Sequence, residues 1–85
     1  MNQLSLRKLK SLHRKVLDGE VARAERDVLL WQMSRVEGET QQELAAVLNA
    51  VAEQRGGEAI TRNAIQKIVQ REDRTAEAFQ EKGRT

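Results

Sequence analysis

The chain has 85 residues, a net charge of +2, no cysteine and no proline, and Trp31 and Phe79 are its only aromatic residues. This composition allows one small domain, favours an all-α fold, and excludes a disulfide framework and cysteine-ligated metal sites. Because no apolar run approaches the roughly 18 residues of a membrane span and no signal-peptide core is evident, we expect a soluble, cytoplasmic protein without a membrane partner.

The first predicted helix covers about residues 4–17, and its charged side chains are all positive. Residues 1–17 contain five bases and no acid, whereas residues 18–60 contain nine acids and four bases. A basic face can attract a polyanion, so Lys8 and Lys10 are candidate phosphate contacts. His13 lies within the apolar side of this helix. We expect it to be packed rather than to bind a metal, because no second His or Cys could complete a site.

The second predicted helix covers about residues 20–36. Its second half is apolar on nearly all sides, which is typical of a central helix with several neighbours. Trp31 and Met33 are predicted core residues. Leu30 points away from Val21 and Val28 on a helical projection, so an alternative places Leu30 in a dimer or partner contact.

The third predicted helix covers about residues 40–55. Thr40 and Glu43 have the spacing of a capping box at its start. Gly56 and Gly57 end it. Its apolar stripe consists of Leu44, Val47, Leu48 and Val51.

The fourth predicted helix covers residues 61–72 or longer, with Thr61 as its cap. One side is aliphatic, and the opposite side carries only amides and cations, which are the groups whose geometry suits base edges and phosphates. The aliphatic residues are Ile65, Ile68 and Val69; the polar ones are Asn63, Gln66, Lys67 and Gln70, flanked by Arg62 and Arg71.

Beyond Arg71 the apolar pattern weakens. Ala76 and Phe79 continue the aliphatic stripe if the helix persists, so this segment is either a helical extension or a frayed end. We expect one domain over residues 1–80 and a disordered tail over residues 81–85.

The segments 40–48 (TQQELAAVL) and 60–69 (ITRNAIQKIV) together resemble the bacterial helix-turn-helix pattern. That pattern has a Thr-capped helix with Glu-Leu-Ala, a turn, and a Thr-Arg cap that opens the recognition helix. The resemblance covers residues 40–71 and is closest to small regulators related to the DNA-binding region of sigma factors. It implies that the third and fourth predicted helices form a helix-turn-helix, so that the four predicted helices make a small DNA-binding domain with an extended turn.

The connection between the two helices of the motif is longer than usual. Residues 50–59 separate Asn49 from Ile60, where the motif has a turn of about 3–4 residues. In one account the third helix continues to Arg55 and residues 56–59 form an extended turn. In the other, the turn lies at Asn49 and residues 51–55 form the recognition helix. We favour the first, because Gly56 and Gly57 would leave the second with a very short helix.

The resemblance implies sequence-specific binding of double-stranded DNA by a small bacterial or phage transcriptional regulator. Asn63 and Gln66 would contact adenine and Arg62 guanine. Lys67 and Arg71 would bind phosphates. The full set of candidate DNA contacts is Thr61, Arg62, Asn63, Gln66, Lys67, Gln70, Arg71, Thr40, Gln41, Gln42, Lys8 and Lys10. For Thr40, Gln41 and Gln42, capping and solvation are the competing interpretation.

An enzyme is not expected, since no nucleophile motif, metal-ligand cluster or Gly-rich phosphate loop is present, and no cofactor is expected. The alternative function is a helical protein-interaction module that modulates the transcription machinery. A homodimer and a protein partner such as RNA polymerase both stay open at this point.

Overall fold

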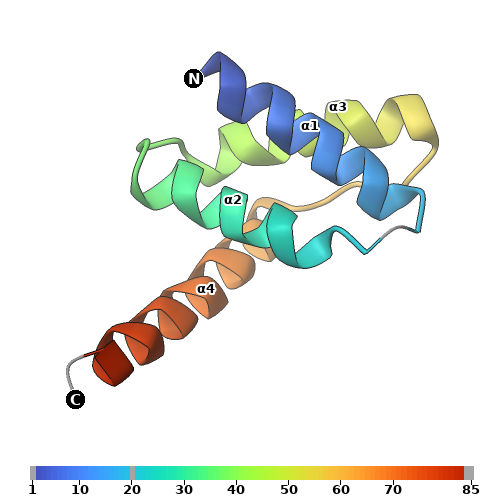
Figure 1. Cartoon of the computed structure of the whole chain (residues 1–85). Coiled ribbons are helices and arrows are strands. Elements are labelled where there is room, and N and C mark those ends of the chain that lie inside the picture. Colours follow the sequence, from blue (N-terminus) through green and yellow to red (C-terminus); the bar gives the residue numbers. More distant parts are fainter. Residues whose placement is uncertain (1, 20, 84–85) are drawn as a thin grey trace.

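The computed structural model describes residues 2–19 and 21–83, with side chains to residue 78. The described chain is all-helical, which confirms the predicted fold class. Its helices are α1 (Gln3–Leu17), α2 (Arg23–Arg35), α3 (Gln41–Arg55) and α4 (Arg62–Gly83) (Figure 1).

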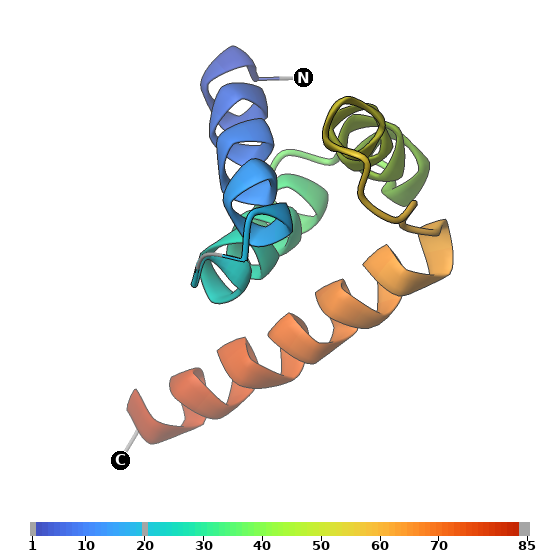
Figure 2. The same cartoon turned by 90° about the vertical axis from the view of Figure 1, so that its right-hand side faces the viewer.

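The helices are joined in a closed ring of contacts. α1 packs on α2 and α3, and α4 packs on the same two helices. α1 and α4 therefore lie on opposite sides of the molecule, as Figures 1 and 2 show from two directions.

Three of the helices have an N-cap residue whose side chain accepts a hydrogen bond from a backbone amide of the first turn. Asn2 caps α1, with its Oδ1 accepting from the Leu4 amide at 2.9 Å. Thr40 caps α3 through the Glu43 amide at 3.1 Å, and Thr61 caps α4 through the Ala64 amide at 3.1 Å. These bonds satisfy amides that lack a partner within the helix, and both threonine caps confirm the sequence prediction.

α2 begins later than the predicted residue 20, and that boundary was wrong. Gly19 has a φ of 84°, Val21 is fully exposed, and Ala22 turns inward to only 5 % exposure before the helix starts at Arg23. The chain needs this connection to reverse direction after α1, and no capping side chain precedes Arg23 to start the helix earlier.

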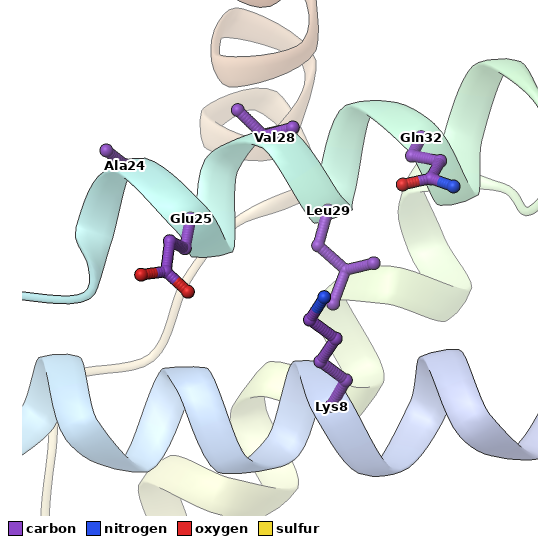
Figure 3. A pocket seen from close by; sticks show the side chains of 6 residues that line it. All are labelled: Lys8, Ala24, Glu25, Val28, Leu29 and Gln32. Carbon is purple, nitrogen blue, oxygen red and sulfur yellow. The ribbon is translucent and has the colours of Figure 1, made fainter.

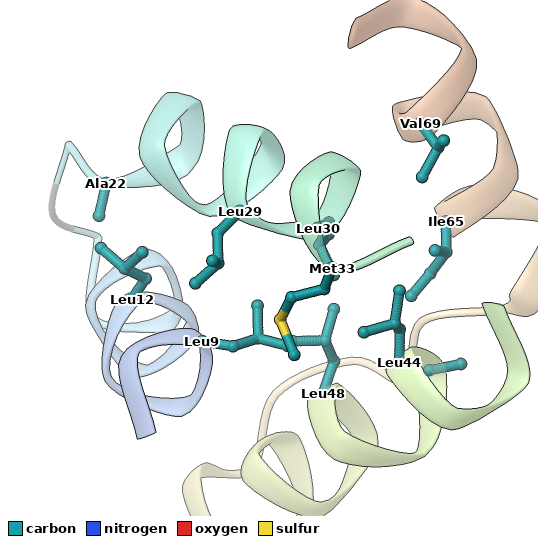
Figure 4. Close-up of a cluster of buried hydrophobic side chains, with 11 residues drawn as sticks. Leu9, Leu12, Ala22, Leu29, Leu30, Met33, Leu44, Leu48, Ile65 and Val69 are labelled. Atoms are coloured by element: carbon teal, nitrogen blue, oxygen red, sulfur yellow. The ribbon is translucent and has the colours of Figure 1, made fainter. Parts of the chain in front are cut away.

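The core lies between the four helices, each of which contributes to it (Figure 4). Met33 is fully buried, as predicted. Trp31 packs at the edge of the core and is only partly buried. The fully buried side chains are those of Leu9, Leu30, Met33, Leu44, Leu48, Ile65 and Val69.

Leu30 belongs to this core, so the alternative that it contacts a partner was wrong. Leu30 is 0 % exposed, whereas Val28 is 49 % exposed. Because α2 packs between α1 and α4, the side that carries Leu29, Leu30 and Met33 faces inward and the side of Val28 stays at the surface.

The connection between α3 and α4 follows the first of the two predicted accounts. α3 continues to Arg55, and Gly56 ends it with a φ of 72°. The chain then returns along α3, and both hydrogen-bonding groups of the Asn49 side chain pair with the backbone of Ile60. Asn49 Oδ1 accepts from the Ile60 amide at 2.7 Å, and Asn49 Nδ2 donates to the Ile60 carbonyl at 3.1 Å. The two ends of the ten-residue connection are thus held side by side.

α4 extends well past residue 72, to Gly83, and its second half projects beyond the other helices (Figures 1 and 2). Residues 81–83 are helical, so the predicted disordered tail was wrong for them. Good helix formers such as Ala76, Glu77 and Ala78 sustain the helix. Residues 84–85 lie outside the described residues.

Candidate nucleic-acid interface

The first half of α4 presents the predicted polar face to solvent. Ile65 and Val69 are 0 % exposed against α2 and α3, so the opposite side of the helix is fixed outward. The exposed residues there are Arg62, Asn63, Gln66, Lys67 and Gln70. Their alternation with the buried aliphatic residues follows the helical repeat.

The polar side chains of this face form no hydrogen bond or ion pair with the described part of the chain. Thr61, in contrast, has a partner within the chain, because its hydroxyl accepts a hydrogen bond from the Ala64 amide. Arg62, Lys67 and the three amides are consequently available to an outside partner. We refer to Arg62, Asn63, Gln66, Lys67 and Gln70 as the α4 polar face.

Arg71 is placed differently from the α4 polar face. Its guanidinium forms an ion pair with Asp27 of α2, and the Asp27 side chain is only 3 % exposed. The other carboxylate oxygen of Asp27 accepts from Arg26 Nε at 3.0 Å and from Arg26 Nη2 at 2.8 Å. Arg71 therefore ties α4 to α2, and its predicted phosphate contact would compete with this ion pair.

His13 completes the buried polar cluster from α1. It is 4 % exposed, which confirms that it is packed, and its Nδ1 lies 3.2 Å from Arg26 Nη1. Burial, and then the neighbouring charge of Arg26, lower the pKa of His13 below its ordinary 6.5. An arginine can only donate, so Nδ1 is the acceptor and the proton of the neutral ring is on Nε2. His13 Nε2 is buried and has no hydrogen-bond partner among the described residues.

A second polar contact holds α4 on α2. Asp73 accepts from Trp31 Nε1 at 2.6 Å and forms an ion pair with Arg35 at 2.6 Å. These hydrogen bonds, first from Arg35 and then from Trp31, lower the pKa of Asp73. Arg71 and Asp73 thus each form an ion pair with α2, and both follow the buried Val69 along α4.

Sequence reasoning missed this role for Arg26, Asp27 and Asp73. On the sequence alone, Asp27 is an acid near the start of a helix, where the helix dipole favours negative charge. An adjacent Arg26–Asp27 pair within an apolar helix was the available signal, since such charges are rarely buried unless paired. Arg71 lies 44 residues from Asp27, and Asp73 lies 38 residues from Arg35, so neither pairing could be inferred from spacing.

The predicted contacts at the start of α3 face unfavourable electrostatics. Thr40 and Gln42 are exposed and Gln41 is partly buried. However, a hydrogen bond that the protonated Glu43 carboxyl donates to the neighbouring Glu39 carboxylate, together with the charge of Glu39, raises the pKa of Glu43. A pair of acids next to this helix end opposes a phosphate there, which favours capping as the role of Thr40.

The predicted contacts on α1 are separated from the α4 polar face. Lys8 is exposed and Lys10 partly buried, but α1 lies on the side of the molecule opposite α4 (Figures 1 and 2). Lys8 instead lines a shallow pocket between α1 and α2 (Figure 3). The structure thus brings together the predicted residues of α4 and leaves Lys8 and Lys10 apart from them.

No family model, no curated protein and no solved structure matches this chain. Within the described ranges, no helix has the length and apolar content to cross a membrane. In the same part of the chain, no three side chains of the metal-binding types gather in a way that could hold an ion.

Proposed function

We propose that this protein binds double-stranded DNA in a sequence-specific manner, through the α4 polar face, as a small transcriptional regulator of a bacterium or phage. One observation carries the proposal. A single exposed face of a firmly packed helix holds amides and cations and includes no acid, and these groups have no hydrogen-bond or ion-pair partner among the residues that the structure describes. An α-helix fits the major groove, where such side chains contact base edges.

The packing of α4 supports the proposal because readout of bases needs a fixed helix. Arg71 and Asp73 tie α4 to α2, and Asn49 holds the residue before its cap. Asn63 and Gln66 would then pair with adenine and Arg62 with guanine, while Lys67 binds a phosphate.

The experiment is selection of bound duplexes from a random pool, followed by anisotropy titration of the best sequence. We expect Gln66→Ala to cost about 1–3 kcal/mol and to relax the preference at one position. Lys67→Ala should weaken all duplexes alike and reduce the salt dependence by about one counterion.

Lys10→Ala is the matched control, since it removes the same charge from α1, the helix on the side of the molecule opposite α4 (Figures 1 and 2). Equal losses from Lys67→Ala and Lys10→Ala would mean that only diffuse charge attracts DNA. Absence of duplex binding at low salt would reject the proposal. It would favour a protein-interaction module, for which the exposed Val28 of α2 and the exposed Val21 just before this helix offer an apolar surface.

A further inference from the structure

The outer side of α2 carries apolar side chains that nothing in the described chain covers. Val28, at the middle of the helix, is 49 % exposed, and Val21 before the helix is fully exposed. Ala24 and Gln32 lie one helical turn before and after Val28 on the same side, and all three border the shallow pocket against α1 (Figure 3).

A lysine and a glutamate lie beside this apolar side of α2. Lys8 of α1 and Glu25 of α2 both line the pocket between these helices. Along the length of α2, Glu25 lies on one side of Val28 and Lys8 on the other, as Figure 3 shows. Neither side chain forms an ion pair within the residues that the structure describes.

We propose that this surface binds a second copy of the chain, with the two α2 helices antiparallel about a two-fold axis at Val28. An isologous contact requires a surface complementary to itself. Reversing α2 about Val28 brings Val28 onto Val28 of the second copy and Ala24 onto Gln32. It also brings Lys8 of each copy opposite Glu25 of the other copy. The dimer therefore contains two equivalent contacts between a lysine and a glutamate.

The same axis bears on the proposed function. It runs across α2 from the side of α1 to the side of α4, since these helices flank α2. Rotation about such an axis leaves both α4 helices on one side of the dimer, as simultaneous contact with two half-sites of a duplex requires. This consequence rests on the proposed DNA binding, whereas the pairing itself does not.

The test is a charge exchange followed by sedimentation equilibrium of the full chain without DNA. Lys8→Glu and Glu25→Lys should each weaken self-association by about tenfold or more, because each places like charges at both contacts. An equimolar mixture of the two variants restores opposite charges at both contacts of a heterodimer and should associate like the unaltered chain. Both residues are exposed, so the helical content should not change.

A monomeric unaltered chain at high concentration would overturn the pairing, and so would a mixture that associates no better than its components. A monomer that captures a different protein through α2 would overturn it as well.

A cysteine cross-link gives an independent measurement, because the chain contains no cysteine. Val28→Cys places one thiol of each copy beside the proposed axis, and a disulfide forms when the Cβ separation is roughly 3.5–4.5 Å. Mild oxidation should convert this variant to a covalent dimer. Ala46→Cys, on an exposed position of α3, is the control and should remain monomeric.

Duplex titration of the same samples separates the two proposals. A chain that dimerises and cross-links at Val28 but ignores duplex DNA refutes only the proposed function. A chain that binds one half-site as a monomer, with no cross-link at Val28, refutes only the pairing.

Discussion

The buried carboxylate of Asp27 joins the buried Arg26 of its own helix to the more exposed Arg71 of α4. Arg26 of α2 binds one oxygen, Arg71 of α4 binds the other, and His13 of α1 accepts from Arg26. A buried charge of this kind is tolerated only while its partners are present.

Replacement of Asp27 by Asn should therefore lower the free energy of unfolding by about 3 kcal/mol, since it leaves the buried Arg26 uncompensated. Urea denaturation measures this loss. Asp18→Asn is the matched control, because Asp18 pairs with Arg55 at 3.2 Å with both side chains well exposed. An exposed pair contributes about 0–1 kcal/mol, so equal losses in the two variants would contradict the structural role of Asp27.

His13 makes stability depend on pH near neutrality. Its folded pKa lies below the ordinary 6.5, so the unfolded chain takes up a proton that the folded protein does not. Stability is fully present above about pH 6.5 and falls as the pH drops below that value toward the folded pKa.

Urea midpoints at about pH 7.5 and pH 6 should show this decrease for the unaltered chain. His13→Gln keeps an acceptor for Arg26 but does not titrate, so its midpoints should coincide. His13 is the only histidine. If the urea midpoint of the glutamine variant decreases with pH as much as that of the unaltered chain, the effect belongs to another group.

At the scale of elements, α4 is positioned by contacts at its start and along its length. Asn49 bonds both backbone groups of Ile60, and Asp27 and Asp73 of the α2–α4 interface hold the middle. The orientation of the α4 polar face thus depends on side chains that do not belong to it.

Asn49→Ala should lower the free energy of unfolding by about 1–3 kcal/mol, because the partly buried Ile60 groups lose their partners. It should also weaken duplex binding through a less fixed α4. Asn63→Ala removes an exposed amide from the same region and should leave the urea midpoint unchanged. A stable Asn49 variant would show that the return segment holds its position without this side chain.

The sequence was sufficient for α3, the first half of α4 and their caps, because helical periodicity and capping act over a few residues. It was insufficient for α2, where apolar residues on nearly all sides gave no indication of whether Leu30 or Val28 faces inward. That choice depends on packing against α1 and α4, as do the ion pairs of Arg71 and Asp73. The separation of Lys8 from the α4 polar face is likewise a property of the tertiary structure.

At the scale of the whole molecule, one small core has to hold four helices together. Leu30 lies at its centre, and domains of this size have a total stability of only about 5–15 kcal/mol. Loss of one central side chain should therefore affect every helix at once.

Leu30→Ala should reduce the free energy of unfolding by about 2–5 kcal/mol and lower the thermal midpoint of the entire helical signal. Val28→Ala removes a similar apolar side chain from the surface and should cost far less at a protein concentration where the chain is monomeric. Circular dichroism of both variants makes the comparison. Equal destabilisation would contradict the inward placement of Leu30.

The bond between Asn49 and Ile60 has a consequence for changes in chain length. Because it fixes both ends of the connection, added residues near Glu58 and Ala59, which are exposed, need not displace α4. Gly57 is less suitable, since it lies against Leu17. The loop tip is therefore the natural place for an epitope tag or a fluorescent label that reports on the protein while leaving its helices in register.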